Sequence, residues 1–150
     1  MRAYRVAKRA YSALDGEGAR KVGGRWNSPG HPMVYAATHL SLAILEQLVR
    51  LPTGKLPADY VWVGIDVPDD LAIEEVAASD LPGWDHPDRR VSRAFGDSWL
   101  RELRSAALLV PAVVVPQERN LLLNPRHAEM RRVTQGEAAP LVFDRRLFQR

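Results

Sequence analysis

The sequence predicts an α+β fold, in which one compact domain combines a mixed sheet with helices. The 150 residues are 46% hydrophobic and 26% charged, an ordinary balance for a single globular core of this length. Two segments repeat apolar side chains with the period of an α-helix, whereas several short runs are apolar and rich in β-branched residues. No internal repeat or long polar linker divides the chain, so we expect one domain over residues 1–150.

The first half of the chain predicts a strand, a glycine-rich loop and a helix. Residues 3–7 are expected to form a short strand, and residues 15–30 a loop rich in glycine and charge, with no helix in it. The apolar run 33–37 is too short for a helix. Residues 38–50 then place leucine and isoleucine at helical spacing before Pro52, which predicts the first helix.

The middle of the chain predicts a buried strand and a second helix. Residues 60–67 are apolar on both alternating faces, which is typical of a central strand. The acidic stretch 69–85 is ambiguous, with a short strand around residues 73–76 as one interpretation. Residues 88–104 repeat apolar side chains every four positions and predict a helix, which Gly96 weakens slightly.

The last third of the chain predicts most of the remaining strands. Residues 107–115 and 119–124 are expected to be two strands joined across Pro116, and residues 141–143 a last short strand. The second half is therefore richer in strands than the first.

The composition excludes several kinds of chemistry. With no cysteine, the chain has no disulfide framework, thiolate zinc site or cysteine nucleophile. The four histidines are not spaced as metal ligands, so we expect no metal. No apolar run approaches the ~20 residues that span a bilayer, and the first segment carries charges where a signal peptide is apolar. We therefore expect a cytoplasmic protein without a membrane partner.

Arginine makes up 18 of the 21 basic residues. Its planar fork suits phosphate and carboxylate groups, so a nucleic-acid-binding module is one alternative. The chain lacks interleaved aromatic and basic residues and any recognition-helix pattern, which leaves arginine content as the only support. We expect no direct nucleic-acid partner, since solvation of the surface explains the arginines equally well.

A carboxylate on an apolar helix face is the most informative residue that periodicity identifies. The helical neighbours of Glu46 are Leu42, Ala43 and Val49, so its side chain lies on or beside the buried face. One interpretation is an ion pair with Arg50, one turn later. The other is a carboxylate held against a substrate that becomes cationic in the transition state.

The glycine-rich loop is not a dinucleotide-binding fingerprint, because Lys21 stands where the third glycine should fall. Its backbone N–H groups could still face a phosphate, with Lys21 and Arg25 supplying charge, although a surface turn is the simpler interpretation. Trp26, between Arg25 and Asn27 in this polar loop, is the tryptophan least expected in the core.

Several short motifs occur in order over nearly the whole chain: Gly16-Glu-Gly-Ala19, Gly23-Gly-Arg-Trp-Asn27, Val34-Tyr-Ala-Ala37, Leu45-Glu46, Val110-Pro111, Leu123-Asn-Pro125 and Phe143-Asp144. Each motif is weak alone, but the ordered set resembles the RES-domain family. The resemblance implies the toxin of a RES–Xre type bacterial toxin–antitoxin pair, with a fold similar to ADP-ribosyltransferases. It also implies NAD as a consumed substrate with no cofactor, a cognate helix-turn-helix antitoxin of the Xre type, and a homodimer as an open possibility.

The resemblance further assigns the family's active-site Arg, Tyr and Glu to Arg25, Tyr35 and Glu46. Glu46 would stabilise the ribose cation formed when the nicotinamide–ribose bond breaks. Arg25 would bind the diphosphate or orient the carboxamide, and Tyr35 would stack on the substrate. Growth arrest would follow from phosphorolysis, hydrolysis or ADP-ribosyl transfer, among which the sequence does not decide.

A second group of residues is expected to bind substrate or hold the loop around it: Lys21, Trp26, Asn27, Ala112 and Asn120. Ala112 stands where the family has the serine that follows its Val-Pro step. The missing hydroxyl supports the alternative of a catalytically weakened RES domain that acts mainly as an antitoxin-binding protein.

Overall fold

The computed structural model describes residues 1–149 and contains one mixed sheet of eight strands. Within these residues β4 and β5 are the only parallel pair, and all other pairs are antiparallel. In order across the sheet the strands are β4 (Ile73–Glu75), β5 (Ala107–Pro111), β6 (Arg119–Leu123), β2 (Val34–Ala37), β1 (Arg2–Lys8), β3 (Tyr60–Asp66) and β7 (Thr134–Gln135), and β8 (Ala139–Pro140) also pairs with β3.

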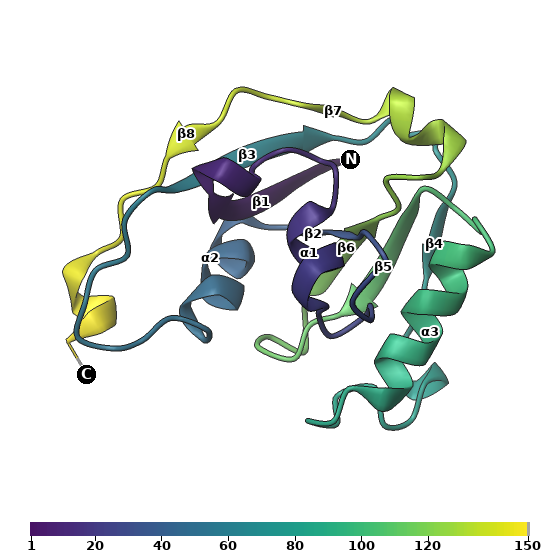
Figure 1. The fold of residues 1–150 in the computed structure, drawn as a ribbon, viewed down its shortest axis with the longest axis horizontal. Helices are drawn as coiled ribbons and strands as arrows, with labels where there is room; N and C mark the ends of the chain where they lie inside the picture. Colours follow the sequence, from purple (N-terminus) through teal and green to yellow (C-terminus); the bar gives the residue numbers. More distant parts are fainter. Residues whose placement is uncertain (150) are drawn as a thin grey trace.

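Two helices cover the same face of this sheet. Tyr35 and Ala37 of β2 point to one face because they are two positions apart. Ala37 packs in a cluster with α2 (Leu40–Leu48), and Tyr35 packs against a cluster that contains Trp99 of α3 (Arg90–Arg101). Figure 1 shows α2 and α3 on opposite sides of the central strands β2, β6 and β5. No helix within residues 1–149 is long and apolar enough to cross a membrane.

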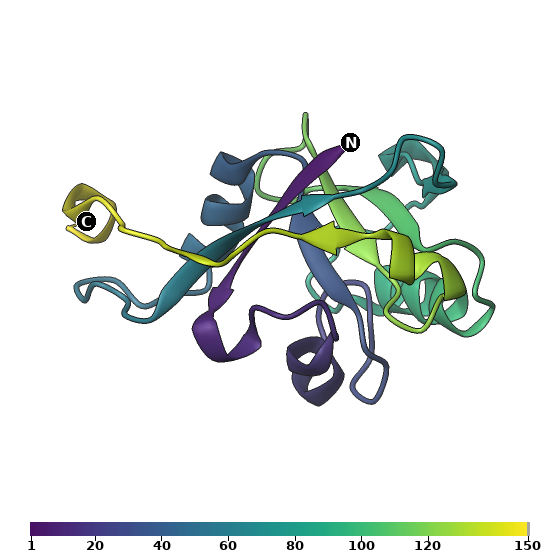
Figure 2. The same ribbon diagram turned by 90° about the horizontal axis from the view of Figure 1, so that it is seen from above.

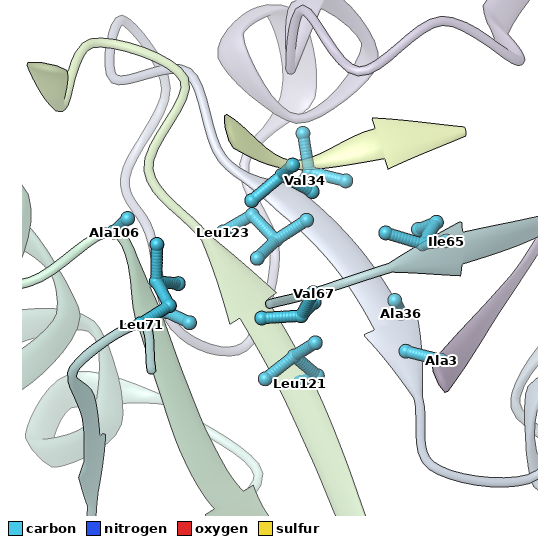
Figure 3. Close-up of a cluster of buried hydrophobic side chains, with 11 residues drawn as sticks. Ala3, Val34, Ala36, Ile65, Val67, Leu71, Ala106, Leu121 and Leu123 are labelled. Atoms are coloured by element: carbon cyan, nitrogen blue, oxygen red, sulfur yellow. The ribbon is translucent and has the colours of Figure 1, made fainter. Parts of the chain in front are cut away.

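The other face of the sheet carries the largest apolar cluster. Its side chains come from alternating positions of β1, β2, β3 and β6 and from the chain that follows β3. Figure 3 shows them converging into one buried group: Ala3, Val34, Ala36, Ile65, Val67, Leu71, Ala106, Leu121 and Leu123. Burial of this apolar surface on one face and of the helix contacts on the other fixes the register of the central strands.

The predicted α+β class with a mixed sheet is confirmed, and most elements lie where the sequence placed them. The strand predicted over 107–115 is too long, because β5 ends at Pro111 and residues 112–118 form a turn. Within it Glu118 N donates to Val115 O, and Pro116 has no N–H to continue a ladder. The short strand expected in the acidic stretch is present as β4.

The glycine-rich loop contains a helix that the sequence did not predict. Helix α1 (Glu17–Val22) begins after Gly16, whose φ is +71°, and ends at Gly23, whose φ is +74° and whose N–H donates to Ala19 O. Asp15 Oδ1 also accepts a hydrogen bond from Glu17 N. Gly23 is an ordinary C-terminal helix signal, but the six residues of α1 contain too few apolar side chains to show helical periodicity.

The C-terminal segment runs along the outer edge of β3, as Figure 2 shows. The strand predicted at residues 141–143 is wrong: β8 ends at Pro140, after which Leu141 N makes one further bond to Tyr60 O, the first residue of β3. Phe143 instead packs edge-on against Tyr60 and Phe148. In the described part of the chain, four short 3-10 helices lie at Arg9–Tyr11, Ala78–Asp80, Ala128–Arg132 and Arg145–Phe148.

Candidate active site

A cleft of about 250 Å³ lies on the face of the sheet that α2 and α3 share. Strands β1 and β2, the last two turns of α2, the loop residue before α3 and the turn after β5 contribute to its walls. The polar and charged residues that line it are Tyr4, Arg25, Tyr35, Glu46, Gln47, Arg50, Arg89 and Asn120.

The structure brings the three predicted catalytic residues together in this cleft. Arg25 comes from the loop after α1, Tyr35 from β2 and Glu46 from α2, and all three line its walls. Trp26 and Asn120 line it as well. The remaining predicted site residues, Lys21, Asn27 and Ala112, do not.

Glu46 is half-buried and is held by an amide. Asn120 Nδ2, on β6, donates a hydrogen bond of 2.8 Å to Glu46 Oε1. The predicted alternative, an ion pair with Arg50, is not formed among the described residues. The neighbouring Gln47 Nε2 donates to Val6 O at 3.0 Å, which fastens α2 to β1. The carboxylate therefore has one fixed oxygen and one that is open to a ligand.

Arg25 reaches from its loop to the segment that precedes α3. Its Nη1 donates to Trp84 O at 3.3 Å and to His86 O at 3.1 Å. Partial burial lowers the pKa of Arg25, and the nearby Arg89 charge lowers it further, whereas Glu46 acts in the opposite direction. A guanidinium keeps its charge under these shifts, so the cleft retains a cation at this point.

The Tyr35 hydroxyl is committed to the loop that carries Arg25. It accepts a hydrogen bond from Trp26 N at 2.9 Å and donates one to Asn27 Oδ1 at 2.7 Å. A Cβ on Gly24 would lie 2.5 Å from this hydroxyl oxygen, so only glycine permits the approach. Burial raises the pKa of Tyr35, and the neutral phenol persists. Tyr35 lines the cleft, and its hydroxyl oxygen positions the loop.

Asn27 and Trp26 fix the same loop through buried contacts. Asn27 is fully buried, and its Nδ2 donates to Ala19 O at 2.9 Å and to His31 O at 2.8 Å. Trp26 is 2% exposed and stacks on Trp84 at a ring-centroid distance of 6.1 Å. The expectation that Trp26 is the tryptophan outside the core is therefore wrong. Asn27 satisfies backbone carbonyls that a buried loop would otherwise leave unpaired.

Three residues of α3 form hydrogen bonds with this loop. Ser92 Oγ donates to Arg25 O at 2.6 Å, and Arg93 Nε donates to Gly24 O at 2.8 Å. Asp97 accepts from both the backbone N–H and the hydroxyl of Ser28, at 2.8 and 2.6 Å. Arg93 and Asp97 are one helical turn apart and Ser92 adjoins Arg93, so the three lie on one side of the helix. Gly96, on the same face, lets the helix backbone reach the loop.

Two predicted site residues lie away from the cleft. Lys21 is exposed, and its Nζ lies 5.6 Å from the ring centroid of Tyr11. Ala112 is 1% exposed in the apolar cluster that contains Val6, Leu42 and Ala43. The buried side chains around it are therefore apolar, with Tyr4, Tyr60 and Trp62 packed at the edge of the cluster.

The sequence reasoning missed two cations that line the cleft. Arg50 follows Glu46 by one helical turn, a spacing that could have placed both on one wall. Arg89 is the residue before α3 and has a positive φ of 60°. No sequence pattern predicts that its side chain lines the cleft. Within residues 1–149, no group of three or more His, Asp or Glu side chains is placed to hold a metal ion.

Comparison with known proteins agrees with the resemblance that the ordered sequence motifs indicate. A family model described as RES domain matches residues 2–144. A protein of Sphingobium sp. (strain YBL2) named Prs ADP-ribosylating toxin is 45% identical over 148 residues, which is 95% of this chain and 92% of that protein. A protein of Yersinia enterocolitica serotype O:8 / biotype 1B named Toxin Res is 36% identical over 152 residues, covering 98% of this chain and 99% of its own length.

The fold is also similar to a solved structure. The crystal structure titled as the M. tuberculosis MbcT-MbcA toxin-antitoxin complex contains a chain that matches with a TM-score of 0.73 and 22% sequence identity. The match covers 99% of this chain and 86% of that chain. At this identity the likeness bears on the fold alone, and it agrees with the predicted fold class.

Proposed function

This chain belongs to the RES-domain family, and from that premise we propose that it is an NAD-consuming toxin of a bacterial toxin–antitoxin pair. The reaction breaks the nicotinamide–ribose bond of NAD in the cleft between α2 and the start of α3. The single observation that carries the proposal is Glu46, a carboxylate fixed by Asn120 inside a cleft that Arg25 and Tyr35 also line.

The chemistry of the bond explains why a carboxylate is needed. When the C–N bond to nicotinamide breaks, its electron pair neutralises the pyridinium ring, which leaves without being protonated. The ribose carbon then carries positive charge, as in glycoside hydrolysis. The open oxygen of Glu46 stabilises this charge and accepts a ribose hydroxyl, an interaction that strengthens as the charge develops. Asn120 keeps the carboxylate oriented, which removes reorganisation from the step.

Arg25 and Tyr35 serve the same step in different ways. Arg25 is anchored through Nη1 to two backbone carbonyls, so its remaining N–H groups are held in one direction beside Glu46. They orient the substrate's polar groups. The Tyr35 ring gives the nicotinamide or ribose a flat apolar surface, and its hydroxyl keeps Trp26 and Asn27 in register.

We propose ADP-ribosyl transfer to a protein as the reaction type. The support is the 45% identical relative, which is named for ADP-ribosylating Prs. In such a transfer a side chain of the acceptor forms the new bond to the ribose carbon and loses its proton to solvent. Prs is the first acceptor to test, with phosphate and water as the competing ones, and the reaction belongs to the cytoplasm, where a toxin of this kind meets cellular NAD.

A cognate antitoxin is the partner that the proposal requires. The structural neighbour was solved in a toxin–antitoxin complex, and we propose a helix-turn-helix antitoxin of the Xre type for this chain. Co-expression with the adjacent reading frame should restore growth and yield a stable complex. The mass of the purified toxin alone reports whether it also forms the homodimer expected above.

The experiment that tests the function separates the acceptors. Purified protein is incubated with NAD in three arms, namely buffer, inorganic phosphate and Prs, and the nicotinamide and ADP-ribosyl products are quantified. The proposal expects nicotinamide release together with ADP-ribose on Prs. Nicotinamide release without labelled Prs would overturn the transferase assignment alone, and absence of NAD loss in every arm would overturn the function.

A further inference from the structure

Three guanidinium groups and one carboxylate line the cleft, which leaves a surplus of two positive charges there. The groups are Arg25, Arg50 and Arg89 against Glu46. Their mutual influence is visible at Arg25, whose pKa is lowered by burial, then by Arg89, with a smaller lowering from Arg50. Like charges gathered around one cavity repel each other, so an anion bound between them is stabilised by all three.

Two of the three guanidinium groups have no hydrogen-bond or ion-pair partner among residues 1–149. Arg25 is bound to the carbonyls of Trp84 and His86. The side chains of Arg50 and Arg89, in contrast, make no hydrogen bond or ion pair with any of residues 1–149, although both line the cleft. Each guanidinium therefore keeps all of its N–H donors for a ligand.

The backbones that carry these two arginines are fixed. Arg50 N donates to Gln47 O at 3.0 Å in the turn that follows α2. Arg89 has φ 60° and ψ 12°, a left-handed conformation that is unfavourable for residues other than glycine. Its carbonyl accepts a hydrogen bond from Arg93 N at 2.9 Å. A strained residue persists where its surroundings determine its conformation, and such residues gather at ligand sites.

We propose that Arg50 and Arg89 form the binding site for the diphosphate of NAD, which rests on the proposed function of the same cleft. Two guanidinium forks match the two phosphates, each of which offers paired oxygens for bidentate hydrogen bonds. Arg25, already anchored to carbonyls, stays beside Glu46 at the nicotinamide end. This division of roles separates the residue that positions the reacting ribose from those that hold the diphosphate.

The positions of the three side chains fit this division. Glu46 lies in the last turn of α2, and Arg50 follows two residues after the end of that helix, where its N–H donates to Gln47 O. Arg89, the residue before α3, lines the same cleft. In the proposed pose the ribose C1′ lies beside Glu46 and the diphosphate lies between Arg50 and Arg89.

The test measures binding separately from turnover. In a Glu46→Gln background NAD is expected to be consumed more slowly by about 100-fold or more, so its Kd can be measured by calorimetry before it is used up. The Kd of nicotinamide riboside, which has no phosphate, is measured in the same way. Arg50→Gln and Arg89→Gln should each weaken NAD about tenfold or more, the value of one charge-assisted hydrogen bond, and the double variant more. Binding of nicotinamide riboside should not change. The matched control is Arg90→Gln, an exposed neighbour of Arg89 that does not line the cleft.

Arg89→Gly separates binding from folding. Glycine accepts the positive φ, so this variant should melt at a higher temperature than wild type while binding NAD more weakly. A merely structural role for Arg89 would move both properties in the same direction. Unchanged NAD affinity in the arginine variants, or equal weakening of NAD and nicotinamide riboside, would overturn this inference. Wild-type NAD turnover, measured alongside, shows independently whether the proposed function stands.

Discussion

Gly96 of α3 lies where the helix backbone meets the loop that carries Arg25. A Cβ at this position would lie 2.7 Å from the Trp26 carbonyl carbon and 3.2 Å from Trp26 Cβ, and closer still to the carbonyl oxygen. These are mainly backbone atoms, which cannot turn aside as a flexible side chain would. Gly96→Ala therefore pushes α3 away from the loop.

The expected loss of stability can be worked from these contacts. Overpacking against backbone costs about 1–3 kcal/mol. The shift also weakens the bonds from Ser92 to Arg25 O and between Asp97 and Ser28, at about 0.5–1.5 kcal/mol each. Alanine returns about 1 kcal/mol as a better helix former than glycine. The net loss is about 1–5 kcal/mol, or about 2–20 °C in Tm for a chain of this length.

The assay compares thermal and urea unfolding of wild type, Gly96→Ala and Gly18→Ala. Gly18 is the matched control, because it also lies within a helix but its Cβ would meet only Tyr11 Cδ1, at 3.9 Å. Gly18→Ala should be neutral or stabilising by up to about 1 kcal/mol. If Gly96→Ala is as stable as Gly18→Ala, the close approach of α3 to the loop is not as described here.

Three further predictions concern the residues around Glu46. Tyr35→Phe should cost about 1–3 kcal/mol, because it leaves buried partners of the hydroxyl unpaired. Burial raises the pKa of Tyr35 in the folded state. The contribution of the Tyr35 hydroxyl to the free energy of unfolding is therefore fully present below the ordinary tyrosine pKa near 10 and is lost as the pH rises above it. The unfolding curves of wild type and Tyr35→Phe should converge at alkaline pH. Asn120→Ala should lower kcat about tenfold with little change in Tm, since it releases the Glu46 carboxylate; an unchanged kcat would show that the hydrogen bond does not orient it. Ala112→Ser should leave NAD turnover unchanged and destabilise the fold by about 1 kcal/mol or more, because its surroundings are apolar; a gain in turnover would restore a role for the hydroxyl.

Elements with strong periodicity were predictable from the sequence alone. Helices α2 and α3 and strand β3 follow from apolar spacing, since each buries a continuous stripe or face. Helix α1 was missed because its six residues contain no buried side chain. The strand expected at residues 141–143 was predicted from apolar residues that in the structure pack as an aromatic cluster instead.

The cleft itself depends on contacts between distant parts of the chain. Residue spacing indicated that Glu46 lies beside an apolar helix face, but its partner Asn120 is 74 positions away. The hydrogen bonds between α3 and the loop join residues that are 67 to 69 positions apart, as with Ser92 and Arg25. Gly96 was interpreted as a defect in a helix, and only the packed structure shows that it permits a close approach. Local patterns carry no information on such pairs.

The central claim is that the Glu46 carboxylate stabilises the cation formed as the nicotinamide–ribose bond of NAD breaks. The most direct measurement is the rate of nicotinamide release by wild type and by Glu46→Gln, with matching Tm values as evidence that both are folded. Because glutamine is nearly isosteric but uncharged, the variant should lose about 100-fold or more in kcat while still binding NAD. A folded Glu46→Gln protein that releases nicotinamide at the wild-type rate would contradict the account.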